Sequence, residues 1–114
     1  MSLKYAHEKF HTAVLTLAGH GRIQERLINS YVFSLGHLKT ADDIPNALQS
    51  RFDELCKELT KFDATGDEGR VQATVSKLND FEINKLIEDI VSLNDDICMK
   101  LALTDETYQD IHQS

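Results

Sequence analysis

Two histidines and a glutamate near the N-terminus have the residue types and spacing of a metal-dependent hydrolytic site. His7, Glu8 and His11 fit the pattern HExxH, in a stretch whose apolar spacing predicts a helix. Residues four apart on a helix point the same way with Cβ atoms about 5–6 Å apart, so both imidazoles can bind one Zn²⁺ ion. Glu8 would be the general base on the metal-bound water. The motif therefore indicates a metal-dependent hydrolase as one candidate function.

The surroundings of the motif favour a structural role for the two histidines. A catalytic zinc site needs a third protein ligand, which Glu25 or Glu54 could supply, but several other glutamates are equally suitable. Val14 and Leu17 occupy the places where the extended form of the motif has a glycine and a histidine. The histidines also border the predicted core stripe of Phe10 and Leu17. We keep them as candidate metal ligands and treat metal-dependent hydrolysis as the alternative function.

Another histidine, His37, lies in the segment Gly36-His37-Leu38-Lys39, which resembles histidine phosphotransfer domains. Those domains are helical bundles of similar length that carry one exposed histidine in the middle of a helix. In that family a residue separates the histidine from the leucine and the lysine, whereas His37 adjoins Leu38 directly. His37 also lies near a predicted helix end, where a histidine complements the helix dipole.

The remaining polar and thiol groups predict ordinary structural roles. Asp63, Asp67 and Glu68 lie in a glycine-bearing segment, but their spacing differs from the alternating ligands of a calcium-binding loop. Cys56 and Cys98 are flanked by leucine and isoleucine at helical spacing, which is typical of small buried residues. We therefore expect neither a disulfide nor a cofactor.

Charge is distributed unevenly along the chain. Residues 1–78 hold ten acidic and ten basic side chains, whereas residues 79–114 hold nine acidic and two basic ones, so the last third accounts for the net charge of −7. Glu88, Asp89, Asp95 and Asp96 form the candidate interaction surface. Such a surface repels nucleic-acid phosphates and anionic membranes and attracts a basic protein. Small acidic helical inhibitors, such as the immunity proteins of nuclease toxins, are similar in shape and charge. A solvated helix face explains the same pattern.

Size and composition predict one domain. The chain has 114 residues, of which 41% are hydrophobic and 27% charged, values typical of a folded globular protein. No apolar run approaches the roughly 20 residues that span a bilayer, and the N-terminus lacks the profile of a secretory signal. We therefore expect a cytoplasmic protein.

Hydrophobic periodicity predicts helices throughout. The single proline, Pro45, suits the first position of a helix, and Asn79 with Glu82 forms a capping-box pair. Residues 71–75 alternate like a strand, but a lone strand would lack a partner, so we expect a short helix there. The expected main helices cover residues 3–18, 23–39, 45–62 and 79–103, with a loop at 63–69 and a short helix at 70–78.

These patterns predict an all-α bundle of four main helices plus one short helix. The bundle domain covers residues 1–103, and residues 104–114 form a short terminal helix or a frayed tail. If one apolar stripe stays exposed, a homodimer is the expected remedy, with Tyr5, Phe33 and Tyr108 as contact candidates. The main expectation for function is a non-enzymatic protein–protein interaction module that presents its acidic C-terminal helix.

Overall fold

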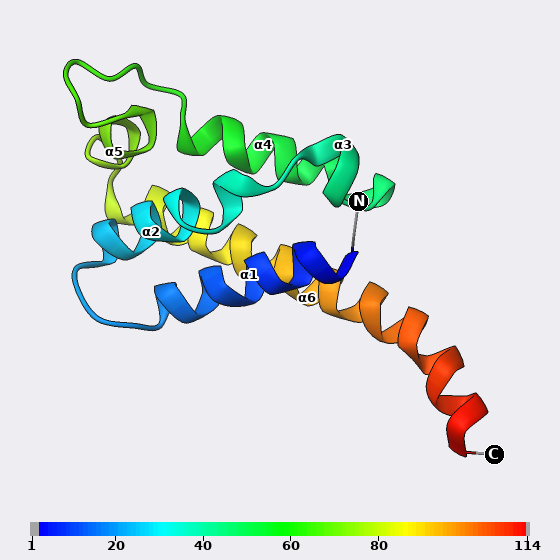
Figure 1. Ribbon diagram of the computed structural model, residues 1–114. Coiled ribbons are helices and arrows are strands. Elements are labelled where there is room, and N and C mark those ends of the chain that lie inside the picture. The colour runs from blue at the N-terminus through cyan, green and yellow to red at the C-terminus, as the bar shows by residue number, and fades with distance from the viewer. Residues whose placement is uncertain (1–2, 114) are drawn as a thin grey trace.

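The computed structural model describes the backbone of residues 3–113 and the side chains of residues 3–104. In this part of the chain six α-helices and two 3₁₀ turns form an all-α bundle without strands, as the sequence predicts (Figure 1). The α-helices are α1 (Leu3–Leu17), α2 (Ile23–Val32), α3 (Thr40–Asp43), α4 (Gln49–Leu59), α5 (Arg70–Val75) and α6 (Asp80–Gln113), and the 3₁₀ turns are Leu35–His37 and Asn46–Leu48.

The helix predicted over residues 23–39 is shorter in the structure. α2 ends at Val32, and Ser34 leaves the helical conformation with φ −133° and ψ −73°. The chain then doubles back in the 3₁₀ turn so tightly that a Cβ atom on Gly36 would lie 2.9 Å from the carbonyl oxygen of Tyr31. Glycine permits this close approach because it has no Cβ. The predicted second helix is therefore a helix followed by a tight turn.

The third predicted helix also has different bounds. Asp43 belongs to the short helix α3, where its carboxylate accepts a hydrogen bond from the backbone N–H of Lys39 at 2.8 Å. α4 begins only at Gln49 and ends at Leu59. The backbone N–H of Phe62 leaves the helical ladder because it donates to the buried hydroxyl of Thr74 at 2.9 Å.

Residues 70–75 form the helix α5, so the choice of helix over strand is confirmed. The capping box at the start of α6 is also confirmed. The side-chain oxygen of Asn79 accepts from the N–H of Glu82 at 2.8 Å, and the Glu82 carboxylate accepts from the N–H of Asn79 at 2.9 Å. α6 extends from Asp80 to Gln113 and so includes residues 104–113.

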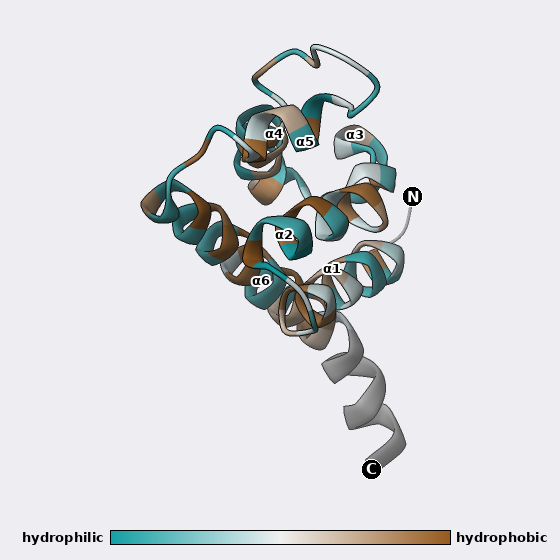
Figure 2. Cartoon of the chain, turned by 90° about the vertical axis from the view of Figure 1, so that its left-hand side faces the viewer, coloured by the Kyte–Doolittle hydropathy of each residue, from teal (hydrophilic) through white to brown (hydrophobic). Residues whose placement is uncertain are grey.

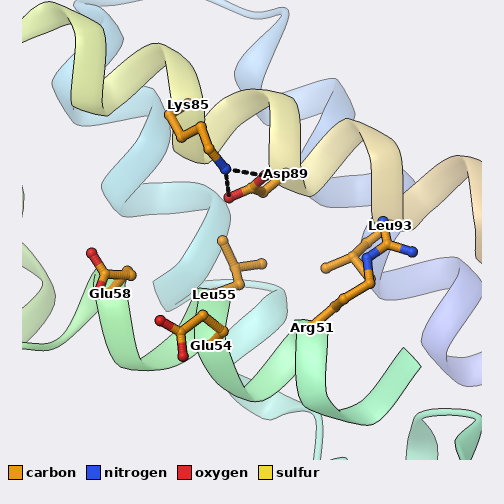
Figure 3. A pocket seen from close by; sticks show the side chains of 7 residues that line it. All are labelled: Arg51, Glu54, Leu55, Glu58, Lys85, Asp89 and Leu93. Atoms are coloured by element: carbon orange, nitrogen blue, oxygen red, sulfur yellow. Dashed lines mark hydrogen bonds and ion pairs between the residues drawn. The ribbon is translucent and has the colours of Figure 1, made fainter. Parts of the chain in front are cut away.

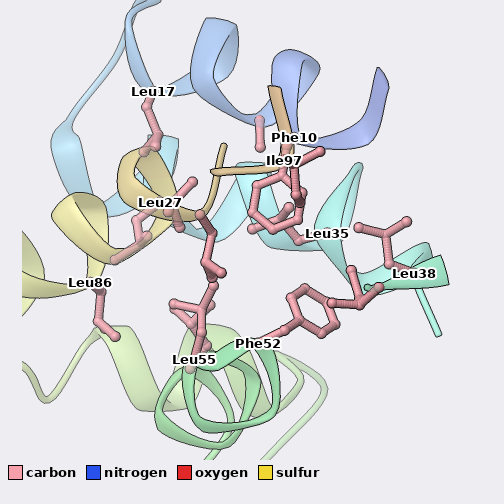
Figure 4. Close-up of a cluster of buried hydrophobic side chains, with 14 of the residues drawn as sticks. Phe10, Leu17, Leu27, Leu35, Leu38, Phe52, Leu55, Leu86 and Ile97 are labelled. Atoms are coloured by element: carbon pink, nitrogen blue, oxygen red, sulfur yellow. The ribbon is translucent and has the colours of Figure 1, made fainter. Parts of the chain in front are cut away.

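The core lies between the long helices. Phe10 from α1 and Phe52 from α4 meet edge to face, with ring centroids 5.9 Å apart (Figure 4). Hydrophobic and hydrophilic residues alternate along α1 and α6 (Figure 2). α6 makes its most extensive contacts with α1 and packs less extensively on α4. α6 contributes a stripe of buried side chains at helical spacing: Ile83, Leu86, Ile90, Leu93 and Ile97.

Among the described residues, no helix has an apolar stretch of the length that a membrane span requires.

Phe10→Ala tests the aromatic centre of the core. Phe10 is fully buried, so its truncation leaves a cavity and is expected to lower the free energy of unfolding by about 3–5 kcal/mol. Leu15→Ala is the control on the same helix, because Leu15 is 58% exposed and its truncation should change stability by less than about 0.5 kcal/mol. Urea unfolding followed by circular dichroism measures both, and equal losses would contradict this account of the core.

Asn79→Ala tests the cap of α6. Loss of the capping oxygen leaves the N–H of Glu82 without its partner and should lower the free energy of unfolding by about 1 kcal/mol. Asn84→Ala makes the same substitution at an exposed position within α6 and should be neutral or slightly stabilising, because alanine favours the helix interior. A loss at Asn84 as large as that at Asn79 would refute the role of the cap.

Candidate interaction surface

The four acidic residues of the candidate surface lie on two different sides of α6. Glu88 and Asp95 are seven residues apart, which is two helical turns, and both are exposed on the side opposite the buried stripe. Asp89 and Asp96 are also seven apart but are only partly exposed, on the flank that borders α4. The sequence predicts one acidic surface made of all four residues. The structure instead separates them into an outer pair, Glu88 and Asp95, and an inner pair, Asp89 and Asp96.

The inner pair is already neutralised within the chain. Arg51 on α4 forms an ion pair with Asp96, and its other nitrogen donates to the Ser92 hydroxyl at 2.9 Å. The Lys85 ammonium lies 3.0 Å from the Asp89 carboxylate, one turn away on α6. The outer pair, Glu88 and Asp95, has no cation within ion-pair distance among the described residues.

A groove runs between α4 and α6 beside the inner pair. Its two adjoining hollows measure about 210 and 270 Å³ and share the walls formed by Glu54, Glu58, Lys85 and Asp89. Figure 3 shows Leu55 rising from α4 towards α6, with Lys85 and Asp89 on the opposite wall. Charged side chains therefore line a channel whose base is apolar.

Large apolar side chains that the sequence patterns did not indicate as contact residues are exposed along α6. Phe81 is 79% exposed, Met99 and Leu103 are each 64% exposed, and Val91 is 39% exposed. Phe81 precedes Glu88 by seven residues, so it lies on the same side of the helix as the outer pair. Its position off the stripe of Ile83 and Ile90 was the sequence signal that could have identified it.

The predicted contact aromatics are only partly described. Phe33 is 66% exposed at the end of α2, and Tyr5 is 37% exposed on α1. The side chain of Tyr108 lies outside the described residues.

The structure brings His7 and His11 together but adds no third ligand. Their rings stack on α1 with centroids 6.1 Å apart. Among residues 3–104, no group of three histidine, cysteine or acidic side chains is placed to hold a metal ion, so neither Glu25 nor Glu54 joins the pair. The hydrolase interpretation of His7, Glu8 and His11 stays a prediction.

The other polar candidates lie in separate places. His37 is exposed at the end of the 3₁₀ turn that follows α2. In the loop at 63–69, the Glu68 carboxylate accepts hydrogen bonds at 3.1 Å from the backbone N–H and the hydroxyl of Thr65. Bonds from its own backbone N–H and from Thr65 hold the pKa of Glu68 below its usual value. Glu68 therefore organises the loop itself.

Cys56 and Cys98 are both half-buried free thiols. Burial, together with the nearby Asp53 carboxylate, raises the pKa of Cys56 from 9.0 to about 12. Cys98 lies near Asn94, with 3.9 Å between its sulfur and the side-chain oxygen. Because the thiolate is the reactive form, Cys56 is expected to react slowly at neutral pH.

The arrangement offers a surface for binding, made of the outer side of α6 and the groove beside it. Comparison with known proteins found no family model, no curated protein and no solved structure that matches this chain.

Thiol reactivity tests the environment of Cys56. At pH 8 the raised pKa lowers the thiolate fraction, and with it the rate of reaction with a disulfide reagent, about a thousandfold relative to the unfolded chain. Cys98→Ser removes the second thiol, and the same variant in urea is the unfolded control. The shift also lowers the free energy of unfolding as pH rises from 9.0 towards 12, because the unfolded chain releases the proton first. Equal rates in folded and unfolded protein would contradict the shift.

Proposed function

We propose that this chain is a non-enzymatic cytoplasmic module that binds a basic partner protein through α6. One observation supports the proposal above the others. On the outer side of α6, carboxylates with no cation in ion-pair distance among the described residues alternate with exposed apolar side chains, in the order Phe81, Glu88, Val91, Asp95 and Met99. Apolar anchors supply binding energy, and unpaired charges supply orientation and a fast encounter.

Burial of the exposed apolar side chains of α6 against a partner would contribute substantially to the free energy of binding. Met99 and Leu103 are each 64% exposed, so burial of the exposed part of either side chain is worth about 1–2 kcal/mol. Exposed apolar side chains that occur singly are common on protein surfaces, but here several share one helix with acidic neighbours. This combination favours a partner that carries both cations and apolar groups.

A homodimer is the competing assembly. A two-fold axis through the outer side of α6 would bring Glu88 and Asp95 of one copy against the same carboxylates of the other. Like charges placed in this way are repulsive, so the surface favours a basic protein over a second copy. Sedimentation velocity distinguishes the two assemblies. A homodimer would give a species of twice the monomer mass in the absence of any partner protein.

Reversal of the outer pair tests the proposal. In Glu88→Lys/Asp95→Lys, cations replace the two carboxylates that a basic partner would contact, so recovery of partners from a native-host lysate should fall at least tenfold. Recovery by the unmodified protein should also fall as salt rises from 0.05 to 0.5 M, since salt screens exposed charges. Quantitative mass spectrometry of the captured proteins measures both effects.

The matched control is Asp42→Lys/Asp67→Lys, which changes the net charge by the same amount at two exposed positions on other elements. Asp96 is unsuitable for the reversal because its substitution would also break the ion pair with Arg51. The proposal is refuted if both double variants retain the same partners as the unmodified protein.

A further inference from the structure

We propose that the groove between α4 and α6 is the docking site for a basic amphipathic helix of the partner protein. The inference rests on the proposed function and deepens it, because it names the surface and the chemistry of the segment that fits it. Four features of the groove carry it: an apolar base, a surplus of carboxylate, an exposed phenylalanine at its edge and one end that is tied shut.

The base of the groove is apolar and belongs to the core. Leu55 on α4 and Leu86 and Leu93 on α6 line the hollows and are each no more than 5% exposed. The polar walls rise from both helices around this base (Figure 3). An occupant that reaches the base must therefore bring apolar side chains between the charged walls, as the apolar face of a helix does when it lies in a groove.

The walls of the groove carry acidic side chains that no basic side chain of the groove neutralises. Three cations line the groove, and each already has an acidic partner: Arg51 pairs with Asp96, Lys61 with Glu58, and Lys85 with Asp89.

Glu54 lines both hollows and has no cation within ion-pair distance among the described residues. Glu82 lines the second hollow, where one carboxylate oxygen accepts the capping bond from the backbone N–H of Asn79. The occupant that complements these walls is positively charged.

Phe81 joins the groove to the outer side of α6. It lines the second hollow although 79% of its surface is exposed, and it lies two turns before Glu88 on the same side of the helix. Aromatic residues, phenylalanine among them, are enriched in protein interfaces relative to the rest of the surface. A helix in the groove would cover Phe81 and place its cations against Glu54 and Glu82.

The two ends of the groove differ. At one end Arg51 crosses from α4 to Asp96 and Ser92 on α6 and ties the helices together. At the other end, near Phe81 and Leu78, no hydrogen bond or ion pair joins α4 to α6 among the described residues. The docked helix is therefore expected to enter at the Phe81 end.

A defined peptide tests the site without knowledge of the natural partner. The probe is a fluorescent helical peptide of about 18 residues made of leucine and lysine with an amphipathic repeat. The controls are the same composition in scrambled order and a version with glutamate in place of lysine. Fluorescence anisotropy measures affinity, and amide chemical shifts of the ¹⁵N-labelled full chain locate the peptide. The expected result is binding of the amphipathic peptide alone, with the largest shifts at residues 54–58 and 81–89.

Two groove variants and two matched controls give the decisive comparison. Glu54→Lys and Phe81→Ser are each expected to lower the affinity for the peptide about tenfold, the effect of losing one hot-spot contact. Asp42→Lys repeats the charge change away from the groove, and Phe33→Ser removes another strongly exposed phenylalanine. Both controls should change affinity less than twofold. Because Glu54, Phe81 and their controls are all exposed, thermal unfolding should be nearly unchanged in the four variants.

The inference is overturned if the scrambled peptide binds equally well, if Asp42→Lys and Glu54→Lys weaken binding equally, or if the chemical-shift changes are confined to other surfaces. A dimer of the unmodified protein that Phe81→Ser dissociates would assign the groove to a second copy and also overturn it. Failure of the proposed function is separate. If reversal of Glu88 and Asp95 removes native partners while Glu54→Lys and Phe81→Ser retain them, the function stands and the groove inference falls.

Discussion

The burial of one stripe of α6 is the constraint on which the other helices depend. Ile83, Ile90 and Ile97 are at most 1% exposed, and their spacing keeps them on one side of the helix. α1 packs along this stripe most extensively, and its buried Ala6 and Ala13 are small enough for a neighbouring helix to come close. α4 completes the core through the contact between Phe52 and Phe10 rather than through an equally close contact with α6 (Figure 4).

The properties of the candidate surface follow from this asymmetry. A helix that buries one stripe presents its opposite side to solvent, and on α6 that side carries Glu88 and Asp95. Because α4 packs less closely than α1, the flank between α4 and α6 is bridged by the long side chain of Arg51 and is hollowed beside it. The same packing that stabilises the fold thus creates both the outer surface and the groove.

The connections between helices are held by polar contacts that local sequence patterns do not reveal. The hydroxyl of Thr74 accepts a hydrogen bond from the backbone N–H of Phe62, twelve residues earlier in the chain. The hydroxyl of Thr40 donates to the carboxylate of Asp53, thirteen residues later, at 2.6 Å. These bonds decide where α4 ends and where α3 lies. By contrast, the capping box of α6 involves residues only three apart and was predictable from their identities.

The sequence by itself determined the all-α class, the positions of α1, α5 and the start of α6, and the acidic character of the last third, because each depends on local periodicity, capping or simple charge. Tertiary structure decided that Asp89 and Asp96 have cations nearby whereas Glu88 and Asp95 have none within residues 3–104, that Phe81 is exposed, and that a groove lies beside it. These features depend on which residue of α4 faces which residue of α6. Residues as far apart as Arg51 and Asp96 become neighbours only when the helices pack, so no local pattern contains that information.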